Sequence, residues 1–78
     1  MTQRELKKYL EKHRLRQSDL AWIAGVNVRH ARAWVLGEYA VPRYVELILN
    51  ALRDGKITLQ WIAEMSDDDL PEGITYHV

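Results

Sequence analysis

The sequence predicts an all-α fold, a compact five-helix domain followed by a short tail. Apolar residues recur at the spacing of one helix face in five separate stretches. Capping residues precede several of these stretches, and glycine or proline separates most of them. The chain has 78 residues, of which 47% are apolar, so it has room for one domain that buries about 60% of its unfolded surface. We therefore expect a partner subunit to add stability.

Residues 2–13 are predicted to form the first helix. Thr2 stands where a helix N-cap is expected, and Glu5 follows three residues later, which is the spacing of a capping box. We expect one face of this helix to pack into the core. The residues on that face are Leu6, Tyr9, Leu10 and His13.

Residues 14–36 fit two short helices that are broken at Gly25. A glycine readily takes the left-handed conformation that ends a helix, and Asn27 can accept a hydrogen bond from the first free amides of the next helix. Arg16 is a poor N-cap, so the first of these helices is expected to use Ser18 as its cap or to have none. The apolar positions of the two helices are Leu15, Leu20, Ile23, Ala24, Val26, Ala31, Trp34 and Val35.

Two further helices are predicted in the second half of the chain. Gly37 ends the third helix, and Pro42 suits the first turn of the fourth, which closes near Gly55. The inward face of the fourth helix is expected to consist of Tyr44, Leu47, Ile48, Ala51 and Leu52. Thr58 can cap a fifth helix that runs to Met65. Its inward positions are expected to be Leu59, Ile62 and Ala63.

The two halves of the chain carry opposite charge. The formal net charge is zero, but residues 1–45 hold nine lysines and arginines against four acidic residues, whereas residues 46–78 hold two against seven. A basic half is typical of a protein that binds a polyanion. We divide the chain into a domain of residues 1–66 and an acidic C-terminal tail of residues 67–78, which is expected to be a short extended edge or disordered.

The composition argues against several classes of protein. The chain has no cysteine, and its longest run free of charged or strongly polar residues, 20–26, is far shorter than a membrane helix of about 20 residues. Ser18 and Ser66 lie in no nucleophile motif and there is no glycine-rich phosphate loop, so an enzyme is not expected. We expect a cytoplasmic protein with no cofactor, no small-molecule ligand and no metal. The three histidines share no ligand spacing: His13, His30 and His77.

Ten residues stand in the order and at the spacing of a known family: Leu15, Gln17, Leu20, Ala21, Gly25, Val26, Trp34, Gly37, Pro42 and Leu47. In this pattern the chain resembles the Cro and CI repressor type of helix-turn-helix, the XRE family of phage and bacterial regulators. The resemblance implies a lambda-repressor-like domain with its helix-turn-helix core at residues 17–36. The size of the chain and residues 32–52 are also similar to short regulators encoded beside phage anti-CRISPR genes.

The resemblance implies a sequence-specific transcriptional regulator that binds double-stranded DNA, expected to be a homodimeric repressor that reads an inverted repeat, often in its own promoter. The third helix is expected to enter the major groove, where Arg29 contacts a guanine and Val28 or Ala33 contacts a thymine methyl group. The expected DNA-binding residues are Gln17, Asn27, Val28, Arg29, His30, Arg32, Ala33 and Arg43. Further candidates for phosphate contacts are Arg16, Tyr39 and Tyr44.

Two apolar regions have more than one interpretation. The fifth helix offers candidates for a dimer interface that can instead close the core: Leu59, Trp61, Ile62 and Met65. Trp22 and Ile23 are large and apolar where relatives carry polar residues, so they need a cover. Ile74 and Tyr76 of the tail, a symmetry mate or another protein partner can supply that cover. The alternative function is therefore a helix-turn-helix fold used as a protein–protein interaction module or an antitoxin-type partner.

Overall fold

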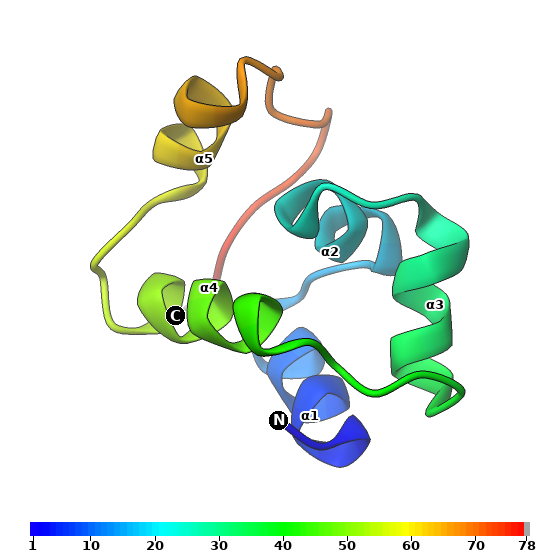
Figure 1. The fold of residues 1–78 in the computed structure, drawn as a ribbon. Helices are drawn as coiled ribbons and strands as arrows, with labels where there is room; N and C mark the ends of the chain where they lie inside the picture. Colours follow the sequence, from blue (N-terminus) through cyan, green and yellow to red (C-terminus); the bar gives the residue numbers. More distant parts are fainter. Residues whose placement is uncertain (78) are drawn as a thin grey trace.

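Five helices follow one another along residues 1–77, the part of the chain that this computed structural model describes (Figure 1). No strand occurs within those residues, so the predicted all-α class with five helices is confirmed. None of the helices combines the length and the apolar composition that a membrane span requires. Their bounds are α1 Gln3–His13, α2 Gln17–Ala24, α3 Val28–Leu36, α4 Arg43–Arg53 and α5 Leu59–Ser66.

Thr2 and Glu5 form the predicted capping box at the start of α1. The Thr2 hydroxyl accepts a hydrogen bond from the Glu5 amide (3.1 Å), and the Glu5 carboxylate accepts one from the Thr2 amide (3.2 Å). The second bond lowers the pKa of Glu5, because it stabilises the charged carboxylate. Two backbone donors that lack a partner inside the helix are satisfied in this way.

A turn of three residues, 25–27, joins α2 to α3. Gly25 ends α2 with a φ of 72°, a left-handed value that costs glycine little. Asn27 caps α3, because its side-chain oxygen accepts a hydrogen bond from the His30 amide at 2.8 Å. Both residues therefore have the roles that the sequence predicts for them.

The start of α2 is capped by Asp19. Its carboxylate is 2% exposed and accepts a hydrogen bond from the Arg16 amide at 2.8 Å. The same carboxylate binds the Arg16 guanidinium at 3.0 and 2.8 Å. The N-cap residue Arg16 makes no side-chain cap, as one of the two expected alternatives has it. In place of Ser18, the Asp19 carboxylate in the first turn reaches back to the amide that precedes the helix.

The core is built mainly by α1 to α4, and Trp34 of α3 is its largest fully buried side chain, at 1% exposed. Each buried leucine adds about 1.5–3 kcal/mol by leaving water, so a small cluster of them stabilises a domain of this size substantially. Tyr9 and Leu10 are buried as expected. The next largest apolar side chains that are fully buried among residues 1–77 are Leu6, Leu20, Leu49 and Val45.

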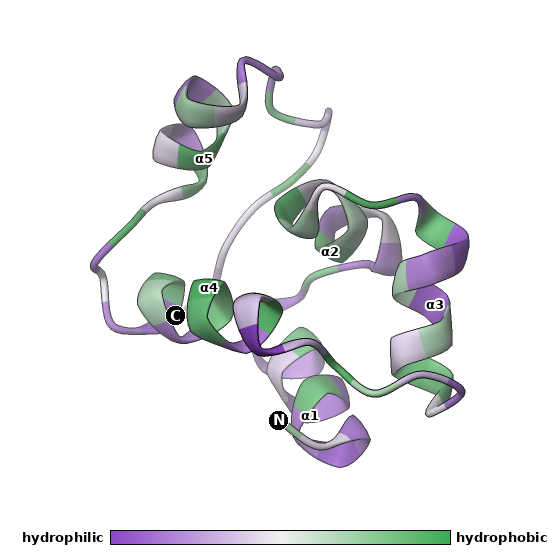
Figure 2. Ribbon diagram, viewed as in Figure 1, coloured by the Kyte–Doolittle hydropathy of each residue, from purple (hydrophilic) through white to green (hydrophobic). Residues whose placement is uncertain are grey.

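The inward face of α4 differs from the predicted one. Val45 and Leu49 are buried in the core, whereas Tyr44 is 45% exposed and Leu47 is 60% exposed. The prediction failed because the apolar residues of α4 spread over a wide arc of the helix, so periodicity alone does not indicate which edge of that arc meets the core. Figure 2 shows hydrophobic residues along most of the middle of α4. Of the predicted face, Leu52 is buried and Ile48 and Ala51 are partly buried.

The tail crosses back from α5 to α1. The Tyr76 hydroxyl lies 2.7 Å from the Tyr9 hydroxyl, which donates to the Leu49 carbonyl at 2.6 Å. The Tyr76 ring stacks on the His13 ring with centroids 4.4 Å apart, and the His77 amide donates to the His13 carbonyl at 3.3 Å. Between residues 68 and 77 the tail has no regular secondary structure, but these contacts fix it against α1 and α4.

Candidate nucleic-acid interface

One side of α3 is buried and the other faces solvent. Ala31, Trp34 and Val35 point into the core. The opposite side is exposed, including Val28 at 48% and Leu36 at 46%. The exposed residues of this side are Val28, Arg29, Arg32 and Leu36. The core therefore fixes α3 through one side of the helix, and the opposite side is exposed to solvent.

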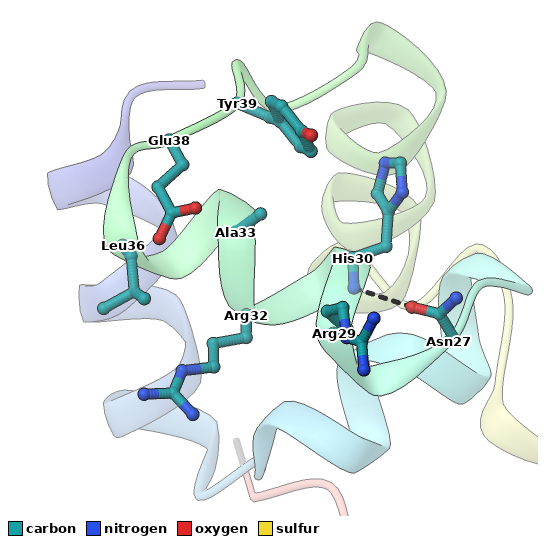
Figure 3. Close-up of a pocket in the computed structure, with 8 residues that line it drawn as sticks. All are labelled: Asn27, Arg29, His30, Arg32, Ala33, Leu36, Glu38 and Tyr39. Atoms are coloured by element: carbon teal, nitrogen blue, oxygen red, sulfur yellow. Dashed lines mark hydrogen bonds between the residues drawn. The ribbon is translucent and has the colours of Figure 1, made fainter.

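A shallow hollow of about 470 Å³ runs along this exposed side (Figure 3). Arg29 and Arg32 supply its positive charge, and neither forms an ion pair within residues 1–77. Glu38 is the acidic residue of the lining. The hollow is lined by Asn27, Arg29, His30, Arg32, Ala33, Leu36, Glu38 and Tyr39. Two guanidinium groups are thus available to a ligand at one surface.

His30 forms part of an aromatic group at the edge of the hollow. Its ring lies edge-on to Trp34 with centroids 5.0 Å apart, and the centroid of Tyr39 is 5.6 Å away. Figure 3 shows His30 and Tyr39 on the side of α3 away from Arg32. Tyr39 is 59% exposed, so its hydroxyl is accessible to a ligand. His30 and Tyr39 therefore form one rim of the surface and Arg32 the other.

Ala33 is less accessible than the sequence indicates. It lines the hollow but is only 7% exposed. Its carbonyl accepts hydrogen bonds from the amides of Glu38 (2.9 Å) and Tyr39 (3.3 Å), so the turn after α3 folds back beside it. Of the two residues expected to meet a thymine methyl group, Val28 has the accessible side chain.

The remaining predicted contacts come from other helices. Gln17 is the first residue of α2 and is partly buried, and Arg43 is the first residue of α4 and is exposed. Tyr44 is exposed beside Arg43. None of the three lines the hollow. The Arg16 side chain is 57% exposed, but its guanidinium pairs with Asp19 at 2.8 Å, which raises its pKa, and donates to the Glu72 carbonyl at 3.3 Å.

The candidates for subunit contacts divide into two groups. Trp61 is 46% exposed and Met65 is 65% exposed. Ile62 is 8% exposed and belongs to the core, as expected for an inward position of the fifth helix, so the core-closing alternative holds for it. Leu59 is partly buried against the same core. Only Trp61 and Met65 are therefore available to another molecule.

The expected apolar patch on α2 is largely buried. Ile23 is 5% exposed, and it shares a small hollow with Ile48 and Ile57. Trp22 is partly buried, and its indole Nε1 has no hydrogen-bond partner among residues 1–77. Helix α4 and the segment before α5 thus line the space around Ile23, so the cover that Ile23 was expected to need lies within residues 1–77.

Leu36 and Glu38 line the hollow but were not predicted from the sequence. Leu36 follows Arg29 by seven residues, which is two helical turns, so continuing the exposed face of the helix finds it. Glu38 lies beyond the end of α3 and reaches the hollow because the chain turns at Gly37, where φ is 79°. Helical periodicity in the sequence does not predict the path of that turn.

No protein-family model, no curated protein and no solved structure matches this chain. Within residues 1–77, no three His, Asp or Glu side chains gather into a group that can hold a metal ion. The chemistry of the site therefore follows from the exposed side of α3, where arginines stand beside apolar and aromatic side chains.

Proposed function

We propose that the chain is a sequence-specific transcriptional regulator of the Cro and CI type that binds double-stranded DNA through α3. The observation that carries the proposal is the exposed side of α3, on which Arg29 and Arg32 form no ion pair with any of residues 1–77. The three-residue turn between α2 and α3 supports a helix-turn-helix of the lambda-repressor-like kind. In such a protein α2 packs against the recognition helix, here α3, on the side away from the DNA.

Helix α3 has the dimensions and side chains that the major groove requires. The groove is about 12 Å wide and admits one α-helix, whose first residues approach the base edges. Arg29 lies in the first turn and its guanidinium matches the two acceptors of a guanine. Val28 precedes it and offers methyl groups to a thymine. Arg29 and Val28 are therefore the proposed specificity residues.

Phosphate contacts are proposed for the rims of the same surface. Arg32 stands one turn farther along α3, and Arg43 opens α4 across the connecting loop. His30 and Tyr39 form the opposite rim, where ring nitrogen and hydroxyl groups can donate to phosphate oxygens. Gln17 and Asn27 are placed at helix starts, and Asn27 already caps α3. These contacts position the helix without reading sequence.

The biological role that fits best is repression. A short protein that occupies an inverted repeat in a promoter, including its own, excludes polymerase from it. In this proposal, occupancy of the DNA site follows the concentration of the protein. The proposed setting is the cytoplasm of a bacterial or phage-infected cell.

The test is a selection of bound duplexes from a random pool, followed by titration of the enriched site. Arg29→Ala is expected to weaken binding to that site by about 10- to 100-fold, the value of one bidentate arginine–guanine contact. Arg32→Ala is expected to weaken all duplexes alike and to reduce the salt slope by about 0.9 for one lost phosphate contact. Arg53→Ala is the matched control, because Arg53 is exposed on α4 and already pairs with Asp54 at 3.0 Å.

An exposed apolar group on α3 favours one alternative, a protein–protein interaction module or antitoxin-type partner. Val28, Leu36 and Tyr39 are 46–59% exposed beside the two arginines. Arginine among aromatic and aliphatic side chains is also typical of protein interfaces. A pool that yields no enriched sequence, together with a shallow salt slope, would favour this alternative and overturn the DNA-binding proposal.

A further inference from the structure

A second hollow, of about 380 Å³, lies between α1 and α4. The two helices meet there (Figure 1), since the Tyr9 hydroxyl of α1 donates to the Leu49 carbonyl of α4 at 2.6 Å. Its lining comes from α1, α4 and Met1, whereas that of the first hollow comes from α3 and the segments beside it. We define the α1–α4 hollow by the five side chains that can bind a ligand there: Lys8, Lys12, His13, Asn50 and Arg53.

Three cations stand at the rim of the α1–α4 hollow. Lys8 and Lys12 are exposed and one helical turn apart, so their side chains leave α1 on the same face. Neither lysine forms an ion pair with any of residues 1–77. Arg53 lines the hollow from α4 and pairs with Asp54 through Nε at 3.0 Å. The rim therefore attracts an anion, and two of its cations are available to bind one.

The two carboxylates that line the same hollow already have partners. The Glu5 carboxylate accepts a hydrogen bond from the Thr2 amide at 3.2 Å in the capping box of α1. The Glu46 carboxylate accepts one from the Met1 nitrogen at 2.7 Å. Because both carboxylates are bound elsewhere, they do not neutralise the lysines of the rim.

Two polar groups without internal partners line the hollow deeper than the lysines. His13 is 3% exposed, and its Nδ1 bonds to the His77 carbonyl. A carbonyl only accepts, so Nδ1 carries the hydrogen and Nε2 is left as the free ring nitrogen. Within residues 1–77, neither this Nε2 nor the partly buried side-chain amide of Asn50 forms a hydrogen bond. The hollow thus combines cations at its rim with unused hydrogen-bonding groups inside.

We propose that the α1–α4 hollow binds a small molecule that carries a phosphate group. A phosphate monoester has up to two negative charges and three acceptor oxygens, which match the Lys8 and Lys12 ammonium groups and the Asn50 amide donor. Its second ionisation has a pKa of about 6, so near neutral pH a phosphate oxygen can share a proton with His13 Nε2. The proposal goes beyond DNA binding and does not rest on it.

The shape of the hollow favours a small molecule over a nucleic acid. Binding sites for small molecules have volumes of about 300–1,000 Å³, and this hollow has about 380 Å³, which leaves room for an organic group beside the phosphate. The phosphates of a duplex lie along a continuous backbone, so they can meet the exposed lysines without reaching the buried His13. A ligand that uses both the rim and His13 has to enter the hollow.

The α1–α4 hollow lies away from the proposed reading surface. Gln3 donates to the Val35 carbonyl of α3 at 2.9 Å, and Lys12, about two and a half helical turns later, lies on the opposite side of α1. A duplex on α3 therefore leaves the hollow open. The sequence predicts no small-molecule ligand because it contains no phosphate-binding motif, whereas the hollow joins residues of α1 with residues of α4 that only the fold brings together.

A titration followed by nuclear magnetic resonance tests the site in the wild-type chain. The probes are adenosine monophosphate and inorganic phosphate at constant ionic strength, with adenosine as the uncharged control. Both phosphates are expected to shift the ring signals of His13 and the side-chain amide signals of Asn50 until they saturate, whereas adenosine is not. Tighter binding of adenosine monophosphate would identify an organic phosphate as the ligand, and equal binding would identify free phosphate; either result supports the site.

Two double variants of equal charge separate the hollow from the general basicity of α1. Lys8→Gln with Lys12→Gln is expected to weaken phosphate binding at least about 10-fold, because two charged contacts are lost. Arg4→Gln with Lys7→Gln is the matched control, since these exposed cations of α1 line a different hollow. The control is expected to change the affinity by less than about twofold, because salt screens charges outside the site. All four residues are exposed, so both variants are expected to fold.

Three results would overturn the proposal. The first is a lack of saturable shifts at His13 with either phosphate. The second is an equal loss of affinity in the two double variants, which would show a screened charge effect of the whole helix. The third is a duplex of unrelated sequence that displaces phosphate and shifts His13, which would assign the hollow to a polyanion. The DNA-binding proposal is tested separately at Arg29, so each can fail without the other.

Discussion

Two helix pairs of this chain are built alike but present different surfaces. Helices α2 and α3 are joined by three residues, and α4 and α5 by five. In the first pair, the exposed side of α3 carries Arg29 and Arg32. In the second pair, the exposed sides carry Leu47, Trp61 and Met65. The first surface is therefore suited to an anion and the second to an apolar partner.

A short chain can support two kinds of contact when its two exposed surfaces differ in chemistry. Exposed guanidinium groups are well solvated, so the α3 surface costs little when it is free and attracts polyanions over a distance set by the salt concentration. Exposed aliphatic and aromatic side chains gain free energy mainly when they leave water. The exposed apolar side chains of α4 and α5 therefore contribute most free energy when another molecule covers them. The exposed side of α3 contributes most when it binds an anionic ligand.

The largest expected effect compares two tryptophans, one from each pair. Trp34 of α3 is 1% exposed and Trp61 of α5 is 46% exposed. Trp34→Ala is expected to lower the free energy of unfolding by about 3–5 kcal/mol, because it leaves a cavity in the core. Trp61→Ala is expected to lower it by about 0.5–1 kcal/mol, because the side chain is already half in water.

Urea unfolding followed by circular dichroism measures both values. The measurements are repeated at several protein concentrations, because any association of two copies adds to the stability in a concentration-dependent way. Equal losses for the two tryptophan variants would contradict the assignment of Trp34 to the core and Trp61 to the surface.

The next largest loss of stability is expected from removing the helix caps of the two helix pairs. Asp19 caps α2 and is 2% exposed, whereas Thr58 caps α5 and accepts from the exposed Trp61 amide at 3.0 Å. Asp19→Ala is expected to cost about 2 kcal/mol, because it removes a cap and a charged hydrogen bond to Arg16 at a buried position. Thr58→Ala is expected to cost about 1 kcal/mol.

Thermal and urea unfolding of the two variants check this order. Asp19→Asn is the matched variant, because it keeps one side-chain oxygen for the Arg16 amide while it removes the charge. A loss for Asp19→Asn that lies between wild type and Asp19→Ala is expected. A larger loss for Thr58→Ala than for Asp19→Ala would reverse the comparison of the two pairs.

Most of the fold could be predicted from local signals. Thr2, Gly25 and Asn27 act within a few residues of their own positions, so their roles follow from spacing and backbone preference. The same holds for the positions of all five helices. Of the candidate site, Val28 and Arg29 are on the exposed side of α3 as predicted, because helical periodicity separates them from Trp34.

The errors arose where distant segments decide the outcome. The apolar residues of α4 form one wide arc, and only tertiary packing decides that Val45 and Leu49, rather than Leu47, are buried. Glu38 reaches the hollow through the turn at Gly37, whose path helical periodicity does not predict. By contrast, helical spacing predicts the inward position of Ile62 beside the exposed Trp61.

The smallest expected effect concerns the tail, which connects the two helix pairs through α1. The Tyr9 hydroxyl donates to the Leu49 carbonyl of α4 and meets the Tyr76 hydroxyl of the tail. Burial, together with the hydrogen bond to Tyr76, raises the pKa of Tyr9 above its usual value near 10. Burial also raises the pKa of Tyr76. Both hydroxyls thus keep their protons in the folded chain under conditions where free tyrosine loses them.

The sign of the pH dependence follows from the protons that each state holds. Below pH 10 both states are protonated at these hydroxyls and the contribution is fully present. As the pH rises through about 10, the unfolded chain releases protons that the folded chain keeps, so stability falls.

Tyr9→Phe is expected to lower stability at neutral pH by about 1 kcal/mol and to flatten the loss of stability at alkaline pH. Tyr44→Phe, at an exposed tyrosine, is the matched control and is expected to keep the wild-type slope. Urea unfolding at several pH values on both sides of 10 measures the slope; a Tyr9→Phe chain as steep as wild type would show that this contact does not join the tail to the two pairs.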